Sequence, residues 1–458
     1  MPMLTLAAHA QAGKKLLVLG LGRTGTATAE ALAAGGADVT VWDDSKPIAI
    51  SGCRLANPLE IGMDGFDALV LSPGIPFTHP EPHPAVKLAQ TSSIPVIGDT
   101  ELLFAEHPGA PFIAITGTNG KSTVTALTAH IFASAGVKAG AGGNLGTPVF
   151  AIQRDEQAPY ILELSSYQLD LCASTKFNVA ALLNLSADHL DRHGNLQGYI
   201  QAKLRIFDRQ TLNDFAFISV DDEYCKSVAS ALERSGQHHV VKVSATTTVA
   251  DGISAKDGLL RFGDTLKPIF DLTSLSRTLP GQHNWQNAAF AAGMARAMGL
   301  RQDQIIAGLK TFRGLAHRQE LIAETVDGLR FINDSKATNA EATSKALKAF
   351  DDIYWIAGGQ AKDNGIAPLL NMLGAVKGVY LIGESQELFA KTLSKGAPKD
   401  MPSHKCGTLE KAVSLAVEHA RLSGGGTILL SPACASWDQF SSFEDRGEAF
   451  SKILNTLI

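Results

Sequence analysis

The run Phe112–Thr123, FIAITGTNGKST, combines two glycines, a lysine and, directly after the lysine, two hydroxyl side chains within seven positions. The glycines let the backbone approach an anion closely. The lysine can reach the β- and γ-phosphates of a nucleotide, and either hydroxyl can ligate Mg²⁺. These residues are Gly117, Gly120, Lys121, Ser122 and Thr123. The common motif has glycine where this sequence has Ile115, but the combination still predicts a phosphate-binding loop rather than an ordinary glycine turn.

The elements that must position this loop are also visible in the sequence. Phe112–Ile115 is a short apolar run with β-branched residues, which predicts a buried strand. A helical pattern follows from Val124, and a helix N-terminus offers free N–H groups and a positive dipole end to an anion. Strand, loop and helix in this order predict a nucleotide-binding domain.

Polar residues follow two further predicted strands. Tyr160–Leu164 carries Glu163 near its end, a candidate Mg²⁺ ligand for which a salt-bridged glutamate is the plainer alternative. Val179–Leu185 runs into Ser186–Gly194, which holds two histidines, two aspartates and an arginine. This density favours a metal and phosphate site. Lys203 lies among apolar residues of a predicted helix, where a solvated face is the default interpretation.

A second glycine-rich loop lies near the N-terminus. Gly20–Gly25 follows a predicted strand in the pattern GxGxxG, and the next predicted strand, Asp38–Trp42, ends at Asp43. This spacing matches the dinucleotide-binding fingerprint and, taken alone, predicts NAD binding. The same loop can hold any pyrophosphate, so a UDP-sugar fits as well. A nicotinamide fluorescence titration distinguishes the two ligands.

Four predicted strands in the last third of the chain lead into polar loops. In a parallel sheet these loops share the carboxyl edge, where ligands bind. The loops are Asn333–Asn339, Ala357–Lys362, Gly383–Ser385 and Ser431–Asp438. Cys434 lies in the last of them, but it has no local histidine partner, so we interpret it as structural.

Composition limits the class of protein. A chain of 458 residues should form two to four domains, and 45% apolar with 19% charged residues is ordinary for a soluble globular protein. The net charge of −5 argues against nonspecific DNA binding. Five scattered cysteines without a CxxC pair suit a reducing cytosol, and no apolar run approaches membrane-spanning length. We therefore expect a cytoplasmic protein.

Taken together, the motifs resemble the Mur ligases of peptidoglycan synthesis, which are ATP-dependent amide-bond ligases. The resemblance covers nearly the whole chain, through GLGRTG, SPGIP, TGTNGKST, LELSSYQL, NLSADHLDRH, HNWQNA, GLAHR, NDSKATN and SPACASWDQF. The last two motifs look like those of members that add D-glutamate. The DNPR motif usual in members that add diaminopimelate is not found.

This resemblance implies an α/β fold of three domains. They are an N-terminal Rossmann-like UDP-substrate-binding domain (1–108), a central P-loop ATPase-like mononucleotide-binding domain (109–316) and a C-terminal Rossmann-like amino-acid-binding domain (317–458). It also implies an ADP-forming reaction that joins D-glutamate to UDP-N-acetylmuramoyl-L-alanine through an acyl phosphate. The implied cofactors are ATP, two Mg²⁺ ions and a carbamate on Lys203, and we expect a monomer.

The resemblance further implies four sets of site residues. The catalytic set is Lys121, Glu163, His189 and Lys203, and the metal ligands are Ser122, Glu163, His189 and Lys203. The ATP-binding set is Gly117, Thr118, Asn119, Gly120, Lys121, Ser122, Thr123, Asn284, Asn287, Arg318, Asp334 and Lys336. The UDP-substrate set is Gly22, Thr24, Asp43, Ser72, Asn144 and Ser165. The D-glutamate set is Thr338, Lys362, Ser436 and Phe443.

Two departures and two alternatives remain. Relatives commonly place a Thr-Arg pair near Asp44–Lys46 and leucine at Trp437, so the uridine and glutamate pockets differ here. A folylpolyglutamate synthase shares the phosphate loop but lacks the N-terminal Rossmann-like domain. A P-loop switch or motor protein would instead turn over ATP without an amino acid or a UDP-sugar.

Overall fold

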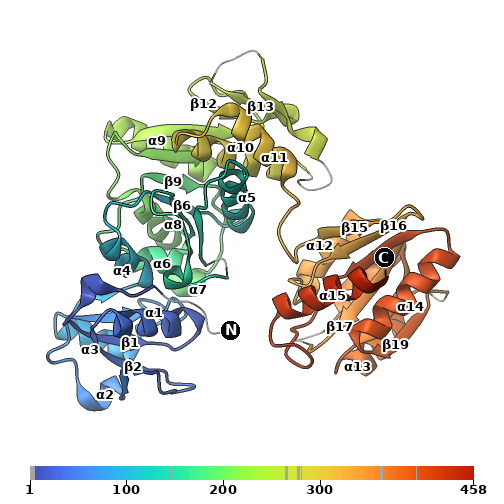
Figure 1. The fold of residues 1–458 in the computed structure, drawn as a ribbon, viewed down its shortest axis with the longest axis horizontal. Helices are drawn as coiled ribbons and strands as arrows, with labels where there is room; N and C mark the ends of the chain where they lie inside the picture. Colours follow the sequence, from blue (N-terminus) through green and yellow to red (C-terminus); the bar gives the residue numbers. More distant parts are fainter. Residues whose placement is uncertain are drawn as a thin grey trace. The chain divides into compact units, whose positions relative to one another are not determined.

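The computed structural model describes residues 6–144, 146–263, 267–275, 279, 281–361, 365–398 and 400–457. The chain forms three β-sheets flanked by helices, which agrees with the predicted α/β fold class (Figure 1). It divides into two compact units, Met1–Phe312 and Arg313–Ile458. Within the described residues, no helix is both long enough and apolar enough to cross a membrane.

The first sheet is parallel, with the strand order β3-β2-β1-β4-β5. Its strands are β1 (Lys15–Leu19), β2 (Asp38–Trp42), β3 (Cys53–Leu55), β4 (Ala68–Leu71) and β5 (Val96–Ile97). Its helices are α1 (Arg23–Ala34), α2 (Pro58–Ile61), α3 (Pro84–Thr91) and α4 (Asp99–Glu106). The predicted GxGxxG loop therefore lies between the central strand and α1, at the carboxyl edge.

The second sheet has the order β14-β13-β12-β11-β10-β9-β6-β8-β7. Its strands are β6 (Phe112–Thr116), β7 (Gly140–Gly143), β8 (Tyr160–Glu163), β9 (Val179–Leu182), β10 (Phe215–Ser219), β11 (His239–Ser244), β12 (Gly252–Ser254), β13 (Leu259–Phe262) and β14 (Phe270–Asp271). The strand β6 lies between β8 and β9, so three carboxyl ends meet beside the phosphate loop.

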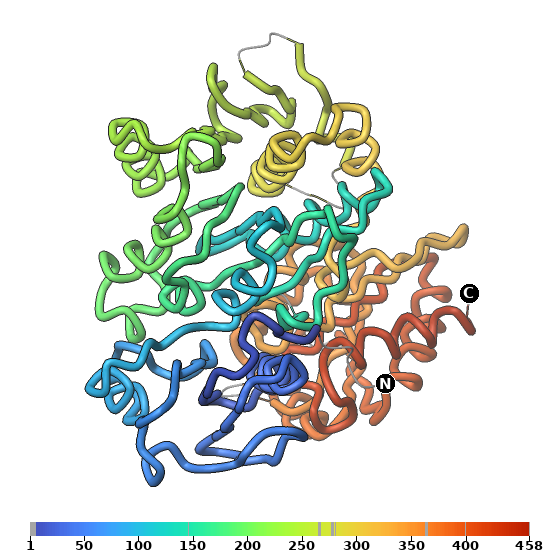
Figure 2. Tube along the Cα trace, turned by 60° about the vertical axis from the view of Figure 1, so that its left-hand side comes forward, coloured from blue at the N-terminus to red at the C-terminus, as the bar shows by residue number. Residues whose placement is uncertain are grey.

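Side chains of β6 alternate between two cores, as the pleat of a strand requires. Ile113 and Ile115 pack with α5 (Lys121–Ser134), α10 (Gln282–Ala297) and α11 (Gln302–Thr311) on one face. Phe112 and Ala114 join the other core, which continues into the first sheet. Figures 1 and 2 both place the blue N-terminal sheet against the cyan-to-green part of the second sheet. A shared core thus holds these two sheets in one unit.

The third sheet has the order β15-β16-β20-β17-β18-β19, with only β15 antiparallel. Its strands are β15 (Glu320–Glu324), β16 (Leu329–Asn333), β17 (Ile353–Gly358), β18 (Val376–Ile382), β19 (Ser403–Gly407) and β20 (Gly426–Leu430). One face is covered by α12 (Ala340–Ala349) and α13 (Gln386–Gly396), the other by α14 (Leu409–Leu422) and α15 (Phe443–Leu457). The four predicted polar loops all leave the carboxyl ends of parallel strands.

The described part of 221–270, a stretch with no clear periodic pattern in its sequence, folds into α9 (Glu223–Ser235) and the short strands β11 to β14. Strands of two to six residues are too short to show a clear alternation, so these strands could not be predicted. The unit boundary at Phe312 lies near the expected boundary at 316/317. The three predicted domain ranges remain predictions.

A pair of glycines in the first loop gives a test of this fold. A Cβ added at Gly25 would lie 1.8 Å from the carbonyl oxygen of Gly20, whereas one at Gly22 would meet nothing within 4 Å. The Gly25→Ala variant should lose at least about 2 kcal/mol of unfolding free energy through overpacking. Gly22→Ala should stay within about 1 kcal/mol of the unmodified chain, as for a helix N-cap. Urea unfolding measures both, and equal stabilities would contradict the close packing.

Candidate active site

The predicted phosphate loop connects β6 to α5. Gly117 and Gly120 have φ of 154° and 86°, and Gly120 is the left-handed residue preceding the helix. A Cβ at Gly117 would lie 2.9 Å from Leu183 Cβ, and one at Gly120 would lie 2.6 Å from Asn287 Oδ1. Both conformation and space therefore require glycine. The N-terminus of α5 remains open to an anion.

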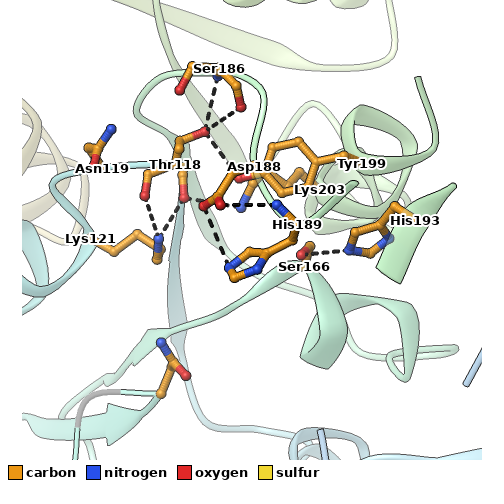
Figure 3. Close-up of polar contacts among 12 residues, drawn as sticks. Thr118, Asn119, Lys121, Ser166, Ser186, Asp188, His189, His193, Tyr199 and Lys203 are labelled. Atoms are coloured by element: carbon orange, nitrogen blue, oxygen red, sulfur yellow. Dashed lines mark hydrogen bonds and ion pairs between the residues drawn. The ribbon is translucent and has the colours of Figure 1, made fainter. Parts of the chain in front are cut away.

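Lys121 folds back over this loop (Figure 3). Its Nζ donates to the carbonyl oxygens of Gly117 and Thr118 at 2.7 and 2.9 Å. Ser122 and Thr123 follow in the first helical turn, both half-buried. The ammonium and the hydroxyls thus lie where a bound triphosphate and its metal would need them.

Asn184, just beyond β9, holds the tip of the loop, a role that the sequence did not reveal. Its Oδ1 accepts from the backbone N–H of Asn119 at 2.8 Å, and its Nδ2 donates to the carbonyl of Asn119 at 3.1 Å. Its own carbonyl accepts from the backbone N–H of Thr118 at 3.0 Å. The only feature of the sequence that could have identified Asn184 was its position near the end of the predicted strand Val179–Leu185, where polar residues begin.

Lys203 lies in α8 (Leu196–Leu204) with only 1% of its surface exposed, so the solvated-face interpretation is wrong. Its Nζ donates to Thr116 Oγ1 at 3.2 Å and to the carbonyl of Gly117 at 3.1 Å. It also lies 4.7 Å from the ring centroid of Tyr199. Burial, and then the nearby charge of Lys121, lower the pKa of Lys203 to about 7. A substantial fraction of this amine is therefore neutral near pH 7.

Glu163 ends β8 and is 2% exposed. Its Oε1 accepts from Asn144 Nδ2 at 2.8 Å, so one residue of the predicted UDP-substrate set contacts one of the predicted metal set. Among the described residues, no donor lies within hydrogen-bond distance of its buried Oε2. An orphaned carboxylate oxygen fits a cation, because a buried charge otherwise requires a partner.

The described residues contain no cluster of three or more His, Cys, Asp or Glu that could hold a metal by itself. Mg²⁺ commonly keeps water ligands and binds through one or two carboxylates together with substrate phosphates. Glu163, a hydroxyl of α5 and phosphate oxygens would suit that pattern. These residues would therefore bind Mg²⁺ together with the phosphates of a nucleotide, and not as a separate metal site.

The segment after β9 holds two histidines in opposite environments. His189, at a φ of 50°, precedes α7 (Leu190–His193), and its side chain is 52% exposed beside Asp188. His193 is buried, and its Nε2 lies 2.9 Å from Ser166 Oγ (Figure 3). Burial, followed by the charge of Lys203, lowers the pKa of His193 to about 4. Of the two, only His189 is accessible to a ligand.

In the first sheet, Asp43 organises the glycine-rich loop. Its Oδ2 accepts from the backbone N–H of Leu21 at 2.7 Å, and its Oδ1 accepts from those of Ser45 and Lys46. Burial opposes ionisation, but these backbone donors outweigh it and hold the pKa of Asp43 below its usual value. Both oxygens accept from backbone N–H groups, one in the glycine-rich loop and two just after β2. This weakens the NAD interpretation, since that requires a carboxylate directed at a ribose.

The rest of the predicted UDP-substrate set lies in loops at the carboxyl edges of these two sheets. The Oγ of Ser72 donates to the carbonyl of Gly20 at 2.8 Å. Gly22 and Thr24 lie at the start of α1. Ser165 caps α6 (Ser166–Asp170) by accepting from the backbone N–H of Gln168. Ser72 and Ser165 thus shape the loops in which they lie.

The α10 N-terminus carries two of the predicted ATP-binding residues. Asn287 is buried, and its Nδ2 donates to Asn284 Oδ1 at 3.0 Å. The oxygen of the Asn287 amide lies against Gly120. The sequence motif HNWQNA is therefore brought to the phosphate loop by α10.

The third sheet carries the remaining predicted residues. Asp334, 4% exposed, accepts from Ser431 Oγ at 2.7 Å and from the backbone N–H of Gln319, near Arg318. Burial raises the pKa of Asp334 to about 7, despite these donors. Lys336 Nζ lies 5.4 Å from the ring centroid of Phe443.

The predicted D-glutamate residues are placed less completely. Ser436 is buried and Thr338 half-buried, whereas Lys362 lies outside the described residues. Arg446, absent from the predictions, is 1% exposed and joins two of the polar loops. It donates to Ser335 Oγ at 2.9 Å and to the carbonyls of Ser335 and Cys434 at 2.8 and 3.1 Å.

Comparisons with known proteins agree with this arrangement. The Mur ligase middle domain matches residues 115–295, and the Mur ligase, glutamate ligase domain matches residues 317–434. The chain is 48% identical over 449 residues to the UDP-N-acetylmuramoylalanine–D-glutamate ligase of Paramagnetospirillum magneticum, covering 96% of each chain. It is 44% identical to the ligase of the same name from Caulobacter sp., covering 97% of each.

Solved structures show the same fold at low identity. The UDP-N-acetylmuramate-alanine ligase of Thermotoga maritima has a TM-score of 0.55 and 14% identity, covering 97% of this chain and all of that one. The UDP-N-acetylmuramoylalanyl-D-glutamyl-2,6-diaminopimelate–D-alanyl-D-alanyl ligase of Acinetobacter baumannii has a TM-score of 0.55 and 17% identity, covering 98% and 92%. The chain belongs to the Mur ligase family. Within that family, its relatives at 43–48% identity carry the name of the D-glutamate-adding ligase.

The buried His193 predicts a pH dependence of stability. Its pKa is about 4 in the fold and about 6.5 in the unfolded chain. The unfolded state therefore binds more protons between these values, and folding stability falls as pH falls from 6.5 toward 4. His193→Gln, which does not titrate, should lack this part of the slope, worth up to about 1.4 kcal/mol per pH unit. Urea unfolding from pH 4 to 8 measures it, and parallel profiles would contradict the burial.

Asn184→Ala should weaken nucleotide binding, because it removes two hydrogen bonds that shape the loop tip. We expect the dissociation constant of ADP to rise about tenfold, or 1.4 kcal/mol, typical of lost hydrogen bonds. Titration calorimetry measures it. Asn213→Ala, at an exposed position before β10, is the matched control and should stay within twofold. An unchanged affinity for ADP in Asn184→Ala would contradict the role of Asn184 in shaping the loop tip.

Proposed function

We propose that this chain joins D-glutamate to UDP-N-acetylmuramoyl-L-alanine at the expense of ATP, in the synthesis of peptidoglycan precursors. The observation that carries the proposal is the site in which Lys121 and Lys203 both contact Gly117 of a phosphate loop. The substrates are those in the printed name of relatives similar over nearly the full length. We propose both the identity of these substrates and a cytoplasmic location.

The chemistry requires an activated carboxylate. The γ-phosphoryl group of ATP passes to the carboxylate of the L-alanyl end, giving an acyl phosphate and ADP. The amino group of D-glutamate then attacks the acyl carbon, the new C–N bond forms, the amine loses a proton, and inorganic phosphate leaves. Such a transfer depends mainly on positioning and charge neutralisation by the protein.

The chain supplies these contributions through distinct residues. Lys121 neutralises charge on the transferring phosphoryl group, while the backbone N–H groups of the loop orient it. Glu163 and a hydroxyl from Ser122 or Thr123 would hold one Mg²⁺, and His189 would contribute to a second. Bound Mg²⁺ would supply further charge neutralisation at the phosphate oxygens.

Lys203 would contribute as a carbamate. In this step the neutral amine attacks CO₂, an N–C bond forms, and one proton is released. The buried position and the lowered pKa of Lys203 favour the neutral amine. The product carries one negative charge shared by two oxygens, which suit Mg²⁺, whereas an ammonium would repel the metal.

The remaining sets complete the proposal. The UDP end of the substrate would contact the loops of the first sheet, with Gly22, Thr24, Ser72, Asn144 and Ser165. D-Glutamate would contact Thr338, Lys362, Ser436 and Phe443. Asn284, Asn287, Arg318, Asp334 and Lys336 would contact the nucleotide.

One assay tests this proposal against its alternatives. Phosphate release is measured with UDP-N-acetylmuramoyl-L-alanine and, in separate reactions, D-glutamate, L-glutamate, L-lysine or diaminopimelate. Of these four amino acids, only D-glutamate is expected to give turnover. Turnover without the UDP-substrate would favour a P-loop switch, and binding of a nicotinamide cofactor would favour an oxidoreductase.

Lys203→Ala tests the carbamate directly. The variant should lose most activity, at least about 10²-fold, because a group that orders the phosphoryl site is lost. Acetate in solution should restore part of the activity by supplying a carboxylate in the vacated space. Lys203→Arg keeps a positive charge and should not be rescued. Full activity in Lys203→Arg would contradict the carbamate.

A further inference from the structure

One arginine joins the first sheet to the segment that carries His189. Arg192, in α7, donates to three backbone carbonyls of the loop after β4. Its Nη1 reaches Gly74 at 3.1 Å, and its Nη2 reaches Ile75 at 3.0 Å and Pro73 at 3.5 Å. A guanidinium can serve three carbonyls at once because its donors form a rigid, planar fork. The residues Ser72–Pro76 are named here the SPGIP loop.

The same guanidinium also contacts the aromatic residue beside both histidines. Arg192 Cζ lies 4.5 Å from the ring centroid of Tyr167, a cation–π contact. The Tyr167 ring lies 5.2 Å from that of His189 and 5.4 Å from that of His193. Contacts therefore run without interruption from the SPGIP loop through Arg192 and Tyr167 to His189.

Close packing at the end of α7 holds this connection in place. Gly194 follows α7 with a φ of 76°, and a Cβ there would lie 2.8 Å from His79 Nε2. The residue that follows α7 thus lies directly against the side chain of His79, three residues beyond the SPGIP loop. A shift of the loop and a shift of α7 are therefore expected to occur together.

We propose that Arg192 is a positioning residue that couples the SPGIP loop to His189. The coupling rests on the proposed function, in which Ser72 lies at the UDP-bearing substrate and His189 at a metal. A substrate that orders the SPGIP loop fixes α7 through Arg192, and α7 in turn presents His189. Binding of the UDP-substrate and the requirement for Mg²⁺ are therefore linked through Arg192.

The test compares Arg192→Met and Arg192→Lys with the unmodified chain. Calorimetry measures UDP-N-acetylmuramoyl-L-alanine binding without ATP, and separately ADP binding; turnover gives the Mg²⁺ concentration for half-maximal rate. Arg192→Met should weaken UDP-substrate binding about tenfold and raise the Mg²⁺ requirement several-fold, as for coupled neighbours. ADP binding should stay within twofold. Arg192→Lys should fall between, since one ammonium cannot replace the fork.

Arg209→Met is the matched control. Arg209 also donates to a backbone carbonyl, that of Ala173. Both residues belong to the part of the chain that forms the second sheet, so this contact does not reach the first sheet. This variant should leave all three quantities within twofold. If Arg192→Met does not fold by circular dichroism, Arg192→Lys decides the result.

Two results would overturn the coupling. Either variant could bind the UDP-substrate and use Mg²⁺ as the unmodified chain does, or ADP and the UDP-substrate could weaken equally, as a purely structural role predicts. Failure of the proposed function looks different, because the unmodified chain itself would then not bind UDP-N-acetylmuramoyl-L-alanine.

Discussion

Two lysines share one hydrogen-bond acceptor in the phosphate loop. The ammonium groups of Lys121 and Lys203 both donate to the carbonyl oxygen of Gly117, at 2.7 and 3.1 Å. Two positive charges this close repel, and the burial of Lys203 removes the water that would screen them. The repulsion is relieved when Lys203 is neutral or when anions enter the site. The arrangement of the two lysines therefore suits a phosphate group.

Secondary structure on both sides of Gly117 imposes this arrangement. Strand β6 and helix α5 fix the loop, while α8 brings Lys203 to it beside Tyr199. Glu163 lies at the end of the neighbouring strand, with one oxygen held by Asn144 and the other unpaired among the described residues. A cationic loop beside an unpaired carboxylate suits a nucleotide together with its metal. A sheet edge with three adjacent strand ends can hold all these groups rigidly.

The parts of this site that could be predicted are local in sequence. Strand, glycines, lysine and helix of the phosphate loop occupy one short run, so their pattern identifies them directly. Asn184, Tyr199 and Arg446 were missed because each contacts a partner far along the chain. These partners are Asn119, Thr118 and Ser335; the Thr118 Oγ1 lies 3.1 Å from the Tyr199 hydroxyl. Those separations are 65, 81 and 111 residues, and only the folded topology brings the partners together. For Lys203 the sequence alone favoured a solvated face, and only the family resemblance implied a metal site. Its burial and its contacts with Thr116 and Gly117 follow from the fold.

The proposed function depends most directly on Lys203 being a buried amine that reacts with CO₂. Carbon-13 NMR of the protein in ¹³C-labelled bicarbonate tests it directly, with Lys203→Met as the reference. We expect a carbamate carbonyl signal in the unmodified chain that is absent from the reference and strengthens when Mg²⁺ and ADP are added. Identical spectra for the two proteins would contradict it.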